Sequence, residues 1–124
     1  MNYYYNIKEK LINNEVYKKV KDYSKNKSDL DTYYEVGKLL VAAGKHYGEG
    51  IIKQYSIKLT REVDKKYNTT LLKRIRQFYL LIEKGATLRH YLSWSHYRIL
   101  IPLKDVDIIN YYINKVISNN LSVR

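Results

Sequence analysis

Three histidines and one acidic-basic triplet are the side chains of this sequence whose types could support catalysis or bind a metal. His46, His90 and His96 are too far apart for a local metal-binding motif, and no Ser/His/Asp order typical of a hydrolase stands out. The triplet Asp64-Lys65-Lys66 has the (D/E)-x-K form of restriction-type nucleases, but its context is helical and no acidic partner precedes it on a strand. We therefore predict no catalytic residue, no metal site, no cofactor and no enzymatic activity in these 124 residues.

The segment 92–103, LSWSHYRILIPL, contains the only tryptophan and the only proline. Ser93 can cap a short helix, and Pro102 ends it because the residue before a proline is pushed out of the α region. His96 and Arg98 fall on other faces of this helix than its apolar residues. The apolar face consists of Trp94, Tyr97, Leu100 and Ile101. We therefore predict a packed helix with Trp94 as a core anchor.

The composition excludes several classes of protein. The chain has no cysteine, which excludes disulfides, thiolate chemistry and zinc fingers. No apolar run approaches the roughly 20 residues of a membrane span, and the N-terminus lacks the order of a signal peptide. We expect a soluble, cytoplasmic, single domain with no membrane partner.

The charge indicates a polyanionic partner. The formal net charge is +11, and residues 45–90 carry most of the excess with eleven basic and four acidic residues. The abundant Lys, Asn, Ile and Tyr are also the residues that AT-rich codons specify, so composition alone leaves a second explanation open.

Apolar spacing is helical throughout, which predicts an all-α fold. In the first half we expect a helix or helix pair over 3–25 with a possible break at Asn13-Asn14, and then a loop over 24–28. The next helix is expected to start at a Ser28 cap and stop at Gly44, with Gly37 on its buried side for close approach of another helix. Its apolar stripe consists of Leu30, Tyr33, Tyr34, Gly37, Leu40 and Val41.

In the second half, Gly48 and Gly50 mark a turn before a helix with Ile52, Tyr55, Leu59 and Val63 on one face. After the turn DKKYN (64–68), a helix capped by Thr69 or Thr70 is expected to reach Lys84 and to be closed by Gly85. Its predicted inner face comprises Leu71, Ile75, Phe78, Tyr79 and Ile82, and its exposed face Lys73, Arg76, Gln77, Leu80 and Lys84, with Arg74 on the flank. A last helix is expected over 104–119, with Val106, Ile109, Tyr112, Ile113 and Val116 inward.

Two helices joined by a turn, the second of them basic, predict a helix-turn-helix-like unit over about 56–84. Arg74 or Arg76 could pair with guanine, Gln77 with adenine, and Lys73 or Lys84 with phosphate. The predicted duplex-DNA site consists of Thr69, Thr70, Lys73, Arg74, Arg76, Gln77 and Lys84. A solvated amphipathic helix is the alternative, because the turn is long and lacks the usual glycine.

Several motifs in fixed order carry a family resemblance: YYEVGKLL, YGEGIIKQYS, YNTTLLKRIRQFY, LSWSHYRILIPL, INYYINKVISNN and LSVR. From about residue 30 onward, the chain resembles the N-terminal domain of the YhcG-like family, whose members carry a C-terminal PD-(D/E)XK nuclease domain. The resemblance divides the chain into a helical segment, 1–28, and a family-matching core, 29–124. It implies an all-helical DNA-binding or targeting domain of a bacterial restriction-like nuclease, in which these residues precede the nuclease domain.

A weaker similarity connects LSWSHYRILIPLKD and NNLSVR with the segment after the helix-turn-helix of ParB-type partition proteins. It places the helix over 70–82 in the recognition position. Two alternatives stay open. An outward Leu80 and the many tyrosines would also suit a homodimer or a protein-interaction module that positions a nuclease, and exposed tyrosines could stack on RNA.

Overall fold

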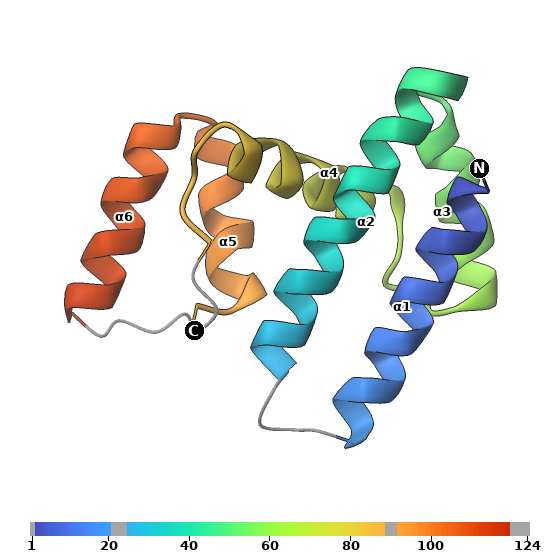
Figure 1. Cartoon of the computed structure of the whole chain (residues 1–124), viewed down its shortest axis with the longest axis horizontal. Helices are drawn as coiled ribbons and strands as arrows, with labels where there is room; N and C mark the ends of the chain where they lie inside the picture. Colours follow the sequence, from blue (N-terminus) through green and yellow to red (C-terminus); the bar gives the residue numbers. More distant parts are fainter. Residues whose placement is uncertain (1, 21–24, 89–91, 120–124) are drawn as a thin grey trace.

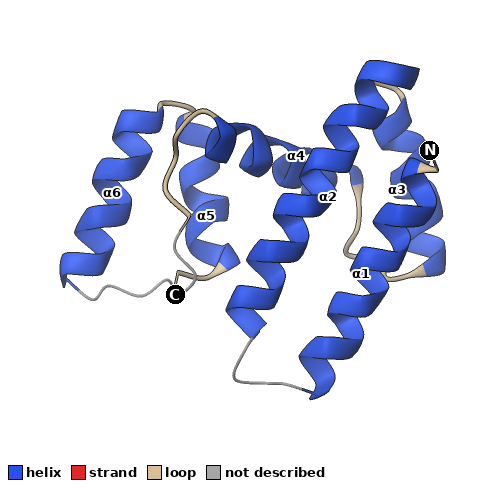
Figure 2. Ribbon diagram, in the orientation of Figure 1, coloured by secondary structure: helices blue, strands red, loops and turns tan. Residues whose placement is uncertain are grey.

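The computed structural model describes residues 2–20, 25–88 and 92–119, and all regular secondary structure in those ranges is helical, which confirms the all-α prediction (Figure 2). In chain order the elements are α1 (Tyr3–Val20), α2 (Lys25–Tyr47), α3 (Ile51–Glu62), α4 (Thr69–Glu83), α5 (Trp94–Leu100), the 3-10 turn η2 (Ile101–Leu103) and α6 (Val106–Asn119).

Helices α1 and α2 lie side by side, and their boundaries differ from the prediction (Figure 1). The expected break at Asn13-Asn14 is absent because the Asn14 side chain is buried, where its amide donates to Asp29 (2.9 Å) and its oxygen accepts from the Ser28 hydroxyl. The predicted loop is also wrong from Lys25 onward, since α2 begins there. Ser28 lies inside α2 and bonds to α1, so it does not cap the helix. Ser24 lies outside the described residues.

The predictions for Gly37 and Gly44 of α2 have different outcomes. A Cβ at Gly37 would lie 2.6 Å from both the Ile75 carbonyl oxygen and the Tyr79 Cβ, so the predicted close approach of another helix is confirmed and the partner is α4. Gly44 does not stop α2, which continues to Tyr47 and ends before Gly48, whose φ is +91°.

Helix α4 lies at the centre of the fold and makes its most extensive contact with α2. Ile75 and Phe78 are buried as predicted, but Leu71, Tyr79 and Ile82 are only partly buried. Leu72 and Leu81 are buried instead. Because α2, α3 and η2 all contact α4, its buried surface is broader than a single amphipathic stripe predicts.

The short helix α5 begins as predicted. The Ser93 side chain accepts from the His96 N–H, and the His96 ring accepts from the Ser93 N–H at 3.1 Å, which completes a capping box. Tyr97, Leu100 and Ile101 are buried, whereas Trp94 is only partly buried. The α-helix ends at Leu100, and Pro102 lies within η2.

Helix α6 begins at Val106, where the Asp105 carboxylate accepts from the Asp107 and Ile108 N–H groups. Ile109 and Ile113 are buried, but Tyr112 is 44% exposed, so its predicted inward position is wrong. Tyr112 directly precedes Ile113 in sequence, so it lies about 100° around the helix from that buried side chain.

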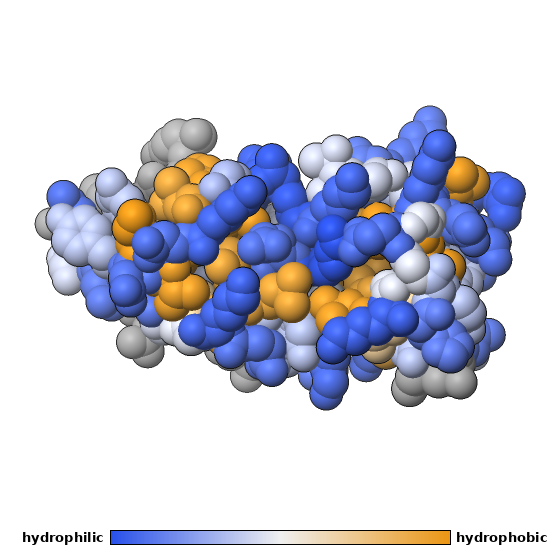
Figure 3. Space-filling model, turned by 90° about the horizontal axis from the view of Figure 1, so that it is seen from above, coloured by the Kyte–Doolittle hydropathy of each residue, from blue (hydrophilic) through white to orange (hydrophobic). Residues whose placement is uncertain are grey.

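No helix in the described part of the chain is long and apolar enough to cross a membrane. Seen from above, hydrophobic side chains form several small patches between hydrophilic ones (Figure 3).

Candidate nucleic-acid interface

A surface hollow of about 650 Å³ lies between the first half of α4, α5 and η2, with Tyr33 of α2 also in its wall. We call it the basic groove. It is lined by Tyr33, Lys66, Asn68, Thr70, Leu71, Arg74, Trp94, Arg98, Ile99 and Pro102. Three of these residues are cationic, and none carries a carboxylate. A wall of this charge is suited to a polyanion.

The cations of the basic groove come from three parts of the chain, since Lys66 precedes α4, Arg74 lies on α4 and Arg98 on α5. Arg74 donates a 3.3 Å hydrogen bond to the backbone oxygen of Arg98. Because this acceptor is neutral, the bond orients the guanidinium without neutralising its charge. Arg74 therefore keeps its charge available for an anionic ligand.

Lys66 is held by α1. Its ammonium pairs with the Glu15 carboxylate at 2.5 Å, and the Tyr67 hydroxyl donates to the same oxygen at 2.7 Å. Burial raises the pKa of the Glu15 carboxyl, but the hydrogen bonds from Lys66 and Tyr67 outweigh it and hold that pKa below its usual value. The buried Ser56 hydroxyl donates to the Tyr67 backbone oxygen at 3.1 Å. Helices α1 and α3 thus fix the turn that places Lys66 at the basic groove.

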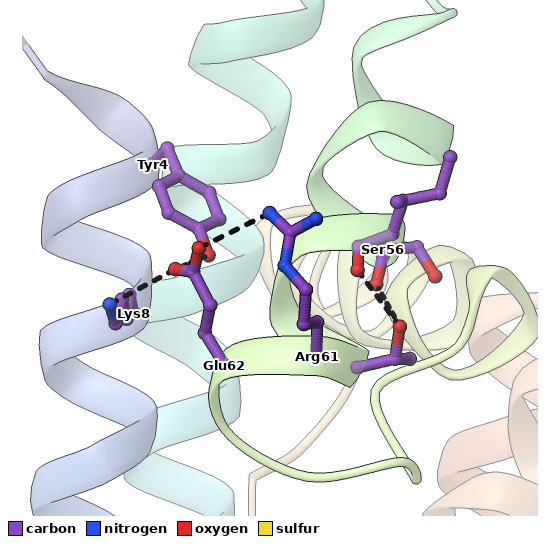
Figure 4. A network of polar contacts seen from close by, with 7 residues as sticks. Tyr4, Lys8, Ser56, Arg61 and Glu62 are labelled. Atoms are coloured by element: carbon purple, nitrogen blue, oxygen red, sulfur yellow. Dashed lines mark hydrogen bonds and ion pairs between the residues drawn. The ribbon is translucent and has the colours of Figure 1, made fainter.

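A second polar cluster joins α1 to the end of α3 (Figure 4). The Glu62 carboxylate accepts from the Tyr4 hydroxyl at 2.6 Å and pairs with Lys8 at 3.0 Å and Arg61 at 3.4 Å. The hydrogen bonds from Tyr4 and Lys8 lower the pKa of Glu62 to about 2. This cluster fixes α1 against the helix that leads into the Lys66 turn.

The start of α4 differs from the prediction by one residue. Asn68, rather than Thr69 or Thr70, is the N-cap, and its side-chain oxygen accepts from the Leu71 N–H at 2.9 Å. Thr69 and Thr70 are the first two residues of the helix. Thr70 is exposed and lines the basic groove, so its hydroxyl remains available to a ligand.

The structure does not bring the seven predicted site residues together. Thr70 and Arg74 line the basic groove, whereas Arg76 and Gln77 line a separate hollow beside the C-terminal half of α2. The expected exposed face of α4 is wrong for Arg76, Gln77 and Leu80, which are partly buried. Arg76 also pairs with Glu49 at 2.7 Å. Lys73 and Lys84 are exposed, but neither lines the groove, and nor does Thr69.

Only Thr70 and Arg74 of the residues that line the basic groove were among the predicted site residues, and the prediction missed Tyr33, Lys66, Trp94 and Arg98. Arg98 was expected on another face of α5 than Trp94, and this expectation is wrong because the two line the same groove. The signal was its spacing, since a residue four positions after Trp94 lies close to it on the same side of the helix. The Trp94 ring packs edge-on against Tyr33, with ring centroids 4.9 Å apart, and against Phe78 at 5.4 Å. Trp94 thus packs as predicted and also forms part of the groove wall.

The residues considered for metal chemistry have structural contacts. Asp64 of the DKK triplet accepts from the Lys66 N–H at 2.9 Å and so shapes the turn. His46 packs against Tyr47 with ring centroids 4.5 Å apart, and His90 lies outside the described residues. Among the residues that the structure describes, no group of three or more His, Cys, Asp or Glu could hold a metal ion.

No curated protein and no solved structure gives a match to the chain. The family model of the DUF1016 N-terminal domain matches residues 6–124. The YhcG-like family is the DUF1016 family, so the resemblance seen in the sequence is confirmed at the family level. The match begins well before residue 30, which corrects the expectation that the first helix lies outside the family's domain. The chain therefore belongs to the DUF1016 N-terminal domain family.

Proposed function

We propose that this domain binds duplex DNA and that the basic groove is its main contact surface. The observation that carries the proposal is the charge of the groove wall, where Arg74 and Arg98 stand with no carboxylate among the lining residues; Lys66 adds a cation whose charge is paired with Glu15 of α1. Two other hollows of the described surface are less suited to a polyanion. One lies between α1 and α2 and is lined in part by Asp31 and Glu35, and the other, which contains Arg76 and Gln77, also includes Glu49.

The polar and apolar residues of the groove have separate roles in this proposal. Arg74 and Arg98 pair with backbone phosphates, and the Thr70 hydroxyl donates to a phosphate oxygen. The exposed Ile99 and the partly buried Trp94 add apolar contact to a base or a sugar. The predicted recognition-helix role of α4 is thereby reduced to its first two turns, since the rest of its length is partly covered.

The family resemblance extends the proposal to the parent protein. We propose that the domain delivers a nuclease domain of the same chain to DNA, and that the nuclease chemistry belongs to that other domain.

The test is a fluorescence-anisotropy titration with random duplex DNA, single-stranded DNA and duplex RNA at about 50 and 200 mM salt. We expect the tightest binding to duplex DNA, and a loss of affinity of at least about tenfold in Arg74→Ala/Arg98→Ala. The salt dependence should also become shallower by about 0.9 in log K per log salt for each phosphate that the variant no longer neutralises.

The matched control is Lys53→Ala/Lys58→Ala on α3, which removes the same charge from exposed positions outside the groove. If the two double variants lose affinity equally, the loss reflects only the change in net charge, which contradicts a site at the groove. Preferential binding of single strands or duplex RNA would change the ligand assigned to it.

A further inference from the structure

The side of α1 that faces away from the core carries several exposed apolar side chains. Tyr5 is 52% exposed, Ile12 36%, Val16 56% and Val20 69%. At about 100° per residue, these side chains and the exposed Glu9 and Lys19 fall within one arc of about 100°. We call these six residues the α1 outer face: Tyr5, Glu9, Ile12, Val16, Lys19 and Val20.

The α1 outer face is hollowed near its N-terminal end. Tyr5, Lys8, Glu9 and Ile12 line a hollow of about 240 Å³. Their spacing of i, i+3, i+4 and i+7 is the spacing of the four residues that receive one side chain of a facing helix in knobs-into-holes packing. Lys8 is held in place by its ion pair with Glu62, so one wall of the hollow is fixed. The hollow therefore fits the side chain of another helix.

The charges of the α1 outer face are arranged for a copy of itself in the opposite direction. If two α1 helices pack antiparallel with Ile12 opposite the partner's Val16, Glu9 faces the partner's Lys19. The partner's Val20 then lies over the hollow. Two-fold symmetry repeats each contact, so one register satisfies both apolar and charged positions twice. A parallel pairing would instead place Glu9 beside Glu9 and Lys19 beside Lys19, which is repulsive.

We propose that the α1 outer face is a self-association surface, on which α1 of a second copy of this chain docks antiparallel in the register Ile12 to Val16. This inference is independent of the basic groove, none of whose lining residues lies on α1. One helix from each partner gives a small interface, so we expect association to require about 10–100 µM protein.

Sedimentation velocity over this concentration range tests the proposal. Val16→Lys places two like charges near the centre of the interface and should weaken the dimer by at least about tenfold. The matched control is Ile57→Lys on α3, because Ile57 is also 56% exposed and lies outside α1. A chain that remains a monomer at the highest concentration, or a dimer equally sensitive to the two substitutions, overturns the proposal.

Charge reversal tests the register. Glu9→Lys and Lys19→Glu should each weaken the dimer, whereas Glu9→Lys/Lys19→Glu should restore it, because the pairs are then reversed. The chain has no cysteine, so Ile12→Cys mixed with Val16→Cys should give a disulfide-linked dimer under mild oxidation. A dimer that forms without rescue in the double reversal and without this crosslink contradicts the antiparallel register.

Discussion

The two sides of α4 carry similar residues in different surroundings. On one side, Arg74 donates to a neutral backbone oxygen in a groove without carboxylates. On the other, Arg76 pairs with Glu49 at 2.7 Å beside α2. The helical repeat places these arginines on different faces, but only the neighbouring helices determine which charge is balanced. The tertiary contacts of each arginine, and not the number of basic residues on α4, therefore identify the candidate site.

The largest effect on stability should come from adding a side-chain atom at the point where α2 and α4 approach each other most closely. Gly37→Ala places a Cβ 2.6 Å from the Ile75 backbone oxygen, so the helices must separate and the free energy of unfolding should fall by about 2–3 kcal/mol. Gly44→Ala is the control in the same helix, because its Cβ meets nothing within 4 Å. Chemical denaturation measures both; equal stability of the two variants would show that this crossing does not position α4.

A smaller effect separates the cap of α4 from the charge of the basic groove. Asn68→Ala should lower the free energy of unfolding by about 1 kcal/mol because the Leu71 N–H loses its acceptor. Asn68→Asp keeps an acceptor and should leave stability nearly unchanged, while its negative charge lowers DNA affinity severalfold. Thermal unfolding and anisotropy are measured on both variants. Unchanged DNA binding in Asn68→Asp would place the ligand away from this end of α4.

The two arginines differ because a carboxylate balances the charge of Arg76 but not that of Arg74. Substitution of Glu49 removes this difference. Glu49→Gln leaves Arg76 without its ionic partner, but Arg76 lies outside the basic groove, so we expect duplex-DNA affinity to rise by less than about threefold, from the lost negative charge alone. Stability should change little, because exposed ion pairs contribute at most about 1 kcal/mol. A Glu49→Gln/Arg76→Gln variant is the control and should return affinity to the original value. A rise of about tenfold or more in the single variant would show that the Arg76 side of α4 also faces the ligand, and would contradict a site confined to the basic groove.

The smallest expected effect is the pH dependence that α1 contributes through Glu62. Its pKa is lowered to about 2, so the stability from its ionised form is present above the ordinary value of 4.5 and is lost as the pH falls toward 2. In Glu62→Gln, the melting temperature should therefore depend less steeply on pH between about pH 5 and 2. Tyr5→Phe, on the same helix but outside the cluster, should leave the original slope. An unchanged slope in Glu62→Gln would show that the cluster does not hold α1 on α3.

The sequence predicted what depends on local signals. The starts of α3 and α5 and the end of α4 lie beside Gly50, Ser93 and Gly85, whose conformations and side chains act within a few residues. The start of α4 was predicted to within one residue, whereas α2 continues past the predicted Gly44 to Tyr47. The close approach at Gly37 was also predictable, because a glycine inside an apolar stripe has a helix-propensity cost that packing can offset.

The errors arise where distant residues decide the outcome. Asn13-Asn14 is a plausible helix break until α2 supplies Asp29 and Ser28 as partners for Asn14. The predicted basic face failed at Arg76 because Glu49 and the C-terminal half of α2 lie over it. Lys66, Arg74 and Arg98 lie in different parts of the sequence and come together only in the folded chain. No short stretch of sequence could therefore reveal the basic groove.

The position of the only tryptophan has a practical consequence for detecting ligands. Trp94 lies in the wall of the basic groove and contacts Tyr33 and Phe78 edge-on. Its emission is therefore an intrinsic optical probe of this one surface, and the fifteen tyrosines can act as donors of excitation energy to it. Selective excitation at the red edge of the absorption band would report occupancy of the groove in the unlabelled, unmodified chain.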